Sequence, residues 1–98
     1  MMSKHVLKVS DTEQERRQLL DELLADHGPQ WTEQYEPGSF GCHELLDRTA
    51  LAADLVDRYV RTHPACIQNQ EWFALAEQAA AALQELYQRI GAAHLDDK

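Results

Sequence analysis

The chain has 98 residues, of which nine are Lys or Arg, 17 are Asp or Glu and 44% are hydrophobic. This length suits one small domain, and the apolar fraction is sufficient for a packed core. The formal net charge of −8 removes the positive field that phosphate backbones and anionic membranes require. No apolar run approaches the roughly 20 residues that span a bilayer, and no signal-peptide pattern opens the chain. We therefore expect a cytoplasmic protein that binds neither nucleic acid nor membranes.

The first segment, residues 4–9, reads KHVLKV and has no second strand with which to pair. We expect an extended N-terminal arm over residues 1–9 that lays apolar side chains on the protein or on another molecule. A first helix should begin at Ser10, because Ser10 and Glu13 have the spacing of a capping box. Gly28 should end it. Its apolar stripe is narrow and consists of Leu19, Leu20, Leu23 and Leu24.

Residues 29–39 lose the helical period and form an aromatic linker that contains Trp31 and Tyr35, with Phe40 directly after it. Exposed linkers rarely contain so much apolar area. Two interpretations stay open for these rings. They fill a gap in the core, or they form a surface for a flat ligand or a protein partner.

Two longer amphipathic helices follow the linker. Ser39 is a suitable N-cap for a helix over residues 40–62, and Asn69 is a suitable N-cap for another. Apolar residues recur at intervals of three and four along both segments, which is the pattern of a helix with one buried face. Gly91 is the predicted end of the last helix, with an extension of its last turn through Ala92, Ala93 and Leu95 left open as the alternative.

These elements predict an all-α fold in a single domain over residues 1–98. The two long helices match in length and are joined by a short connection, so they should form an antiparallel hairpin. The first helix should pack on the flank that shows Leu51 and Leu55. The expected architecture is a three-helix up-down-up bundle, dominated by the hairpin and preceded by the short extended arm.

The string from Gly41 to Arg48 holds most of the side chains with reactive or ligating chemistry. His43 and Asp47 are four residues apart and share a helix face, as do Glu44 and Arg48. The string is not a zinc-protease motif, because that motif requires a second histidine at position 47. Cys42 lies near the helix N-terminus, which favours a thiolate, yet it also falls on the apolar stripe, where a cysteine acts as a small hydrophobe.

An up-down-up bundle would bring together residues from three helix ends. Four potential ligands would then lie at one pole, and could hold Zn²⁺ or a similar ion: His27, Cys42, His43 and His94. No spacing within a single segment enforces this site. His27 and His94 also fit a simpler role, since a histidine at a helix C-terminus complements the helix dipole.

The sequence has no glycine-rich phosphate loop and no nucleophile elbow, so we expect neither an enzyme nor a bound cofactor.

A chain of this size buries a limited share of its surface, and association would cover more of it. We therefore expect a protein-interaction or self-associating module, with a protein partner or a second copy in a homodimer. Its expected contact surface is the exposed flank of the hairpin together with the N-terminal arm. Six further residues are candidates for a ligand or partner surface: Trp31, Tyr35, Phe40, Cys42, His43 and Asp47. The alternative is a small-molecule or zinc-binding bundle that uses the pole of His27, Cys42, His43 and His94.

Overall fold

The computed structural model describes the backbone of residues 2–96 and the side chains of residues 11–95. Over residues 2–96 the chain forms helices and short connections, with no strand. It divides into two compact units, Met1–Glu33 and Gln34–Lys98. The predicted all-α class is confirmed, whereas the up-down-up arrangement of three helices is not.

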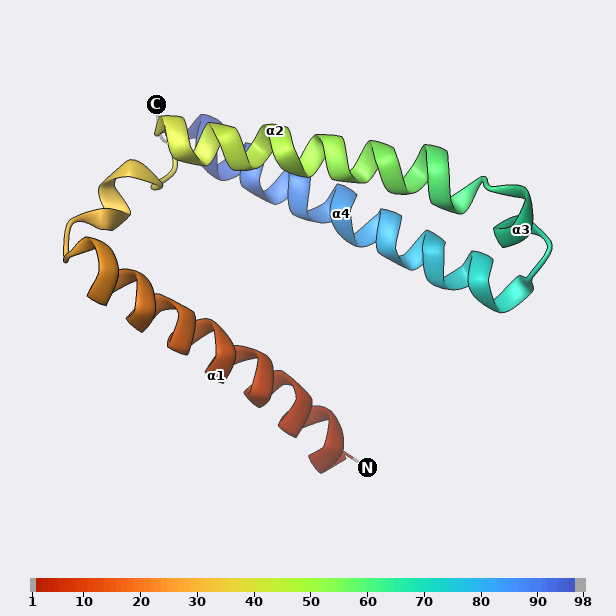
Figure 1. Cartoon of the computed structure of the whole chain (residues 1–98), viewed down its shortest axis with the longest axis horizontal. Coiled ribbons are helices and arrows are strands. Elements are labelled where there is room, and N and C mark those ends of the chain that lie inside the picture. The colour runs from red at the N-terminus through yellow and green to blue at the C-terminus, as the bar shows by residue number, and fades with distance from the viewer. Residues whose placement is uncertain (1, 97–98) are drawn as a thin grey trace. The chain divides into compact units, whose positions relative to one another are not determined.

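The first unit contains helix α1, Met2–His27, and most of the 3-10 turn η1, Trp31–Gln34 (Figure 1). The expected extended arm over residues 1–9 is therefore wrong from Met2 onward, and Met1 lies outside the described residues. A segment without a partner strand satisfies its backbone hydrogen bonds internally when it joins a helix, which favours the helical form. The predicted stop is confirmed, because Gly28 adopts a left-handed φ of 86° and donates to the Leu24 carbonyl.

The exposed surface of α1 contains one concentrated charge cluster. The Glu13 carboxylate accepts hydrogen bonds from Arg16 at 2.8 and 2.6 Å and from Arg17 at 2.9 Å. These bonds, with the attraction of the two positive charges, lower the pKa of Glu13 from its ordinary value of 4.5 to about 2. Four leucines further along the helix are all exposed by more than a third: Leu19, Leu20, Leu23 and Leu24.

The second unit is a long antiparallel hairpin (Figure 1). One arm consists of α2, Phe40–Leu55, and the π-helical segment η2, Val56–Arg61. A single helical turn, α3, Pro64–Ile67, leads to the other arm, α4, Gln70–Asp96. Both predicted N-caps are confirmed. The Ser39 hydroxyl accepts the Cys42 N–H at 3.1 Å, and the Asn69 side chain accepts the Trp72 N–H at 3.0 Å.

The predicted end of the last helix at Gly91 is wrong, because α4 continues to Asp96. A glycine in a helix interior costs about 1 kcal/mol relative to alanine. Here Gly91 packs toward Leu46 of α2, and a Cβ built on it would lie 3.6 Å from a Leu46 methyl. Tertiary packing along the hairpin therefore outweighs the local signal.

Small side chains form the seam between the two arms. Five residues with described side chains are classed as buried, and all five lie in this hairpin: Cys42, Thr49, Ala53, Ala76 and His94. Those on α2 are seven and four residues apart and those on α4 are 18 apart, which are close to whole numbers of helical turns and keep them on one line. Ala53 is 2% exposed and is the most deeply buried of the five. Alanine and threonine at a seam let two helix backbones approach closely.

Enlarging the seam should therefore destabilise the hairpin. We expect Ala53→Leu to lower the free energy of unfolding by about 1–3 kcal/mol, because the added carbons have no space between the two helices. The matched control is Ala81→Leu on the exposed side of α4, which should change that free energy by no more than about 0.5 kcal/mol. Thermal and denaturant unfolding of both variants checks this, and equal effects would contradict the close seam.

The Glu13 cluster predicts a specific pH dependence. Because its pKa is lowered in the folded helix, Glu13 stabilises α1 above its ordinary pKa of 4.5, and this stabilisation disappears as the pH falls toward about 2. NMR titration of the Glu13 carboxyl carbon should give a midpoint near 2. In the double variant Arg16→Ala, Arg17→Ala the midpoint should return toward 4.5, and an unchanged midpoint would exclude the two arginines as its cause.

Candidate functional site

The open end of the hairpin is held by a buried histidine. His94, near the end of α4, is 7% exposed, and its Nδ1 accepts the Gly38 N–H at 2.9 Å. Gly38 has a φ of 90°, a backbone conformation that favours glycine. The bond requires an unprotonated Nδ1, since a protonated ring nitrogen cannot accept. His94 therefore joins the segment before α2 to the last turns of α4.

His43 lies beside this histidine on the surface. The centroids of the two imidazole rings are 5.5 Å apart. The His43 Nε2 is also 3.5 Å from an Asp47 carboxylate oxygen, as the predicted four-residue spacing requires. Both side chains of this pair are more than half exposed, so the ion pair contributes little to stability.

Cys42 occupies the first turn of α2 and is buried. It borders a small depression of about 270 Å³ that is also lined by Tyr35, Leu45 and Arg48. Gly41 forms the floor, where a Cβ would collide with the Gln34 carbonyl and the Tyr35 ring. Burial on the seam favours the structural interpretation of Cys42 over a reactive thiol.

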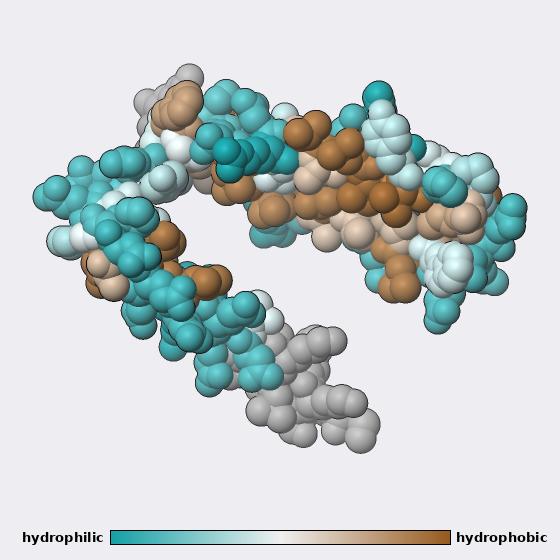
Figure 2. Space-filling model, in the orientation of Figure 1, coloured by the Kyte–Doolittle hydropathy of each residue, from teal (hydrophilic) through white to brown (hydrophobic). Residues whose placement is uncertain are grey.

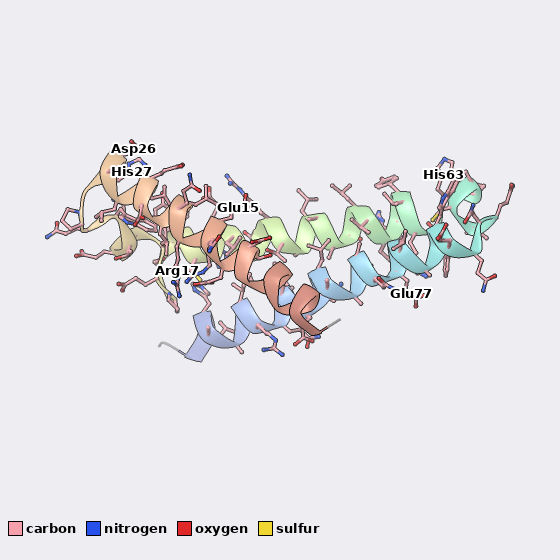
Figure 3. The ribbon with its side chains drawn as sticks, turned by 90° about the horizontal axis from the view of Figure 1, so that it is seen from below. Glu15, Arg17, Asp26, His27, His63 and Glu77 are labelled. Carbon is pink, nitrogen blue, oxygen red and sulfur yellow. The ribbon has the colours of Figure 1, made fainter. Side chains whose placement is uncertain are left out.

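Three of the four residues proposed as a zinc site belong to one unit. Cys42, His43 and His94 lie at the open end of the hairpin, and His27 (Figure 3) ends α1 in the other unit. Among the residues that the structure describes, no group of three or more His, Cys, Asp or Glu side chains could hold a metal ion. The Nδ1 of His94 is already occupied by the Gly38 N–H.

The three linker aromatics are divided between the two units, with Trp31 in the first and Tyr35 and Phe40 in the second. Phe40, the first residue of α2, is 83% exposed, so the interpretation of this ring as core filler is wrong. Tyr35 is also exposed and lies against Gly41 in the depression beside Cys42. Trp31 belongs to the first unit.

The largest exposed apolar surface of the hairpin lies beside the seam. We define the apolar flank as six large side chains that are 44–64% exposed, three from α2 and η2 and three from α4: Leu45, Leu55, Tyr59, Trp72, Leu75 and Leu86. Figure 2 shows hydrophobic residues gathered along the length of the hairpin.

The helix geometry places these six side chains on one side of the hairpin. On α4, Leu75 directly precedes the seam residue Ala76, so the two lie about 100° apart around the helix axis. On α2 and η2, Leu55 directly precedes Val56, which is less exposed and lies toward the seam. In an antiparallel pair, turning in the same sense from the seam around each helix axis leads to the same side of the hairpin. The flank residues of the two helices therefore form one continuous face.

At the closed end of the hairpin, this face deepens into a groove of about 540 Å³. Tyr59 and Val60 line one side, and Trp72 and Leu75 line the other. Cys66 and His63 close it at α3, where Figure 3 shows His63. The π-helical turns of η2 lie directly beside the groove, and such segments are frequent at functional sites.

Residues 34–96 contain nine acidic residues and four arginines, and every one of these arginines lies in a local pair. All four arginines of residues 34–96 pair with an acid one helical turn earlier: Glu44–Arg48, Asp54–Arg58, Asp57–Arg61 and Glu85–Arg89. These pairs are mostly exposed and each stabilises its own helix slightly. They leave the apolar flank as the most distinctive surface of the second unit.

The closed-end groove is the feature that the sequence analysis missed. The intervals of three and four assign both Tyr59 and Trp72 to core-facing stripes, whereas the structure leaves each more than half exposed. A signal was present in the pair Trp72–Phe73. Adjacent residues on a helix lie about 100° apart, so two large neighbouring rings cannot both face one narrow seam.

Comparison with protein-family models, with curated proteins and with solved structures finds no match for this chain. Over the described residues, none of the helices has the length and apolar content needed to cross a membrane. No related protein therefore indicates the role of these residues, and the geometry of the hairpin provides the basis for assigning one.

The bond between His94 and Gly38 predicts the effect of replacing the histidine. We expect His94→Ala to lower the free energy of unfolding by about 1–3 kcal/mol, because it removes a buried acceptor and leaves a void. His94→Asn should be milder, since its amide oxygen can take the place of Nδ1. Hydrogen exchange at the Gly38 amide should accelerate in the alanine variant, and an unchanged exchange rate would contradict the assigned bond.

Proposed function

We propose that this protein is a non-catalytic protein-interaction module whose apolar flank receives an amphipathic helix of a protein partner. The main support for this proposal is a single observation. Six large apolar side chains are grouped on one side of a two-helix hairpin and remain about half exposed. Scattered exposed leucines are normal on a protein surface, but a continuous patch is typical of an interaction site.

The dimensions of the flank favour a helix as the bound element. On α4 it extends from Trp72 to Leu86, and 14 residues at about 1.5 Å each give a row about 20 Å long. Two antiparallel helices form a shallow channel along their length, into which a third helix can place side chains at intervals of three and four. The flank is too long and too open for a single small molecule.

The remaining chemistry agrees with a binding role. No reaction is proposed, because the sequence contains no phosphate loop and no nucleophile elbow. Cys42 and Cys66 are both free thiols, which suits a reducing compartment, and we propose the cytoplasm.

Photo-crosslinking tests this function in cells that express the full chain. With p-benzoylphenylalanine at Leu75, on the flank, irradiation should give adducts that contain a second polypeptide. The matched control places the same residue at Leu95, which is equally exposed at 60% against 59%. Leu95 lies about half a turn away around the α4 axis, so its adducts should be few.

Mass spectrometry of the crosslinked products identifies the second polypeptide. The absence of polypeptide adducts at Leu75, or equal yields at Leu75 and Leu95, would contradict the proposal.

A further inference from the structure

We propose that the partner on the apolar flank is a second copy of this chain, so that two hairpins form a four-helix bundle. This inference rests on the proposed function, since it names the helix donor for the same surface. It is supported by the area of the flank, by the alternation of large and small residues along it, and by the charges around it.

The exposed area of the flank matches one side of a stable interface. With exposed fractions of 44–64%, the six side chains together present on the order of 700 Å². A standard protein interface takes about 800 Å² from each partner. A second copy presents the same area, so the flank of one hairpin is sufficient to cover the flank of another.

The hairpin alone does not enclose a core of large side chains. No large side chain among the described residues is fully buried, and the buried residues of the seam are two alanines, a threonine, a cysteine and His94. Bundles of four helices bury their large side chains between two such pairs. A second hairpin would place the leucines of both flanks in a shared interior.

The residues along α4 suit packing against an identical surface. The flank residues Trp72 and Leu75 are followed by Ala79 and Ala82, and Leu86 follows these two. Both alanines are exposed. In a two-fold interface the same patch meets itself, so large side chains of one copy can lie over the small residues of the other. A surface of uniformly large side chains would lack these spaces.

The charges around the flank do not select a charged partner. The Glu44–Arg48 and Glu85–Arg89 pairs border it near the open end, and each pair is neutral as a unit. A second copy would therefore bring neutral pairs to this end of the contact, although the net charge of the chain is −8. A partner recognised by charge would require an unpaired cluster of one sign.

The test is the mass of the purified full-length chain by sedimentation velocity and light scattering. At roughly 100 µM, well above the micromolar constants that standard interfaces reach, we expect twice the 11.2 kDa chain mass. Leu75→Lys should weaken dimerisation at least about tenfold. Leu95→Lys, the matched control, should leave the dimer intact. Leu86→Lys provides a second flank variant, and circular dichroism confirms that each variant is helical.

Several results would overturn the inference. A monomer at this concentration would do so, as would a dimer that resists both flank variants or is lost in Leu95→Lys. The proposed interaction module and the inference of a second copy can be rejected independently of each other. Crosslinks from Leu75 to a different polypeptide, combined with a monomeric purified chain, would retain the interaction module and reject the second copy.

Discussion

The close contact of small side chains along the α2–α4 seam determines the rest of the second unit. Ala53 and Ala76 allow the two helices to approach, and many of the large apolar side chains of both helices stay at least partly exposed. Six of them are grouped on one side of the hairpin as the apolar flank. The hairpin becomes a scaffold with a rigid, small-residue interior and an apolar face that is not covered within this unit. The exposed apolar face therefore follows from how the core of the hairpin is built.

The same constraint accounts for the groove at the closed end. There the chain changes from α- to π-helical geometry in η2 and turns through α3 before α4 begins. Tyr59 and Trp72 border this groove without filling it. The seam and the groove are consequences of one arrangement, in which small residues bring the helices together and large ones define the exposed surface.

The sequence predicts the hairpin well because its signals are local and repeated. The caps at Ser39 and Asn69 each depend on a side chain and an amide three residues away, and both form as expected. Gly91 and the first nine residues were predicted wrongly, since tertiary packing and the lack of a partner strand outweighed local propensity. The link between Gly38 and His94 joins residues 56 positions apart, so no local pattern could indicate it. Periodicity also could not separate the seam from the flank, because residues 100° apart on a helix belong to the same broad apolar stripe.

The hydrogen bond between Gly38 and His94 has a consequence for how the hairpin comes apart. Paired helices commonly fray from the end where the chain is not continuous, because the terminal turns have the fewest neighbours. In this protein the covalent turn at α3 secures one end, and the imidazole of His94 secures the other. The two helical arms are therefore held together at both ends of the hairpin. The two helices can therefore separate only after the hydrogen bond between Gly38 and His94 breaks, or after the packing around the buried Ala53 is disrupted.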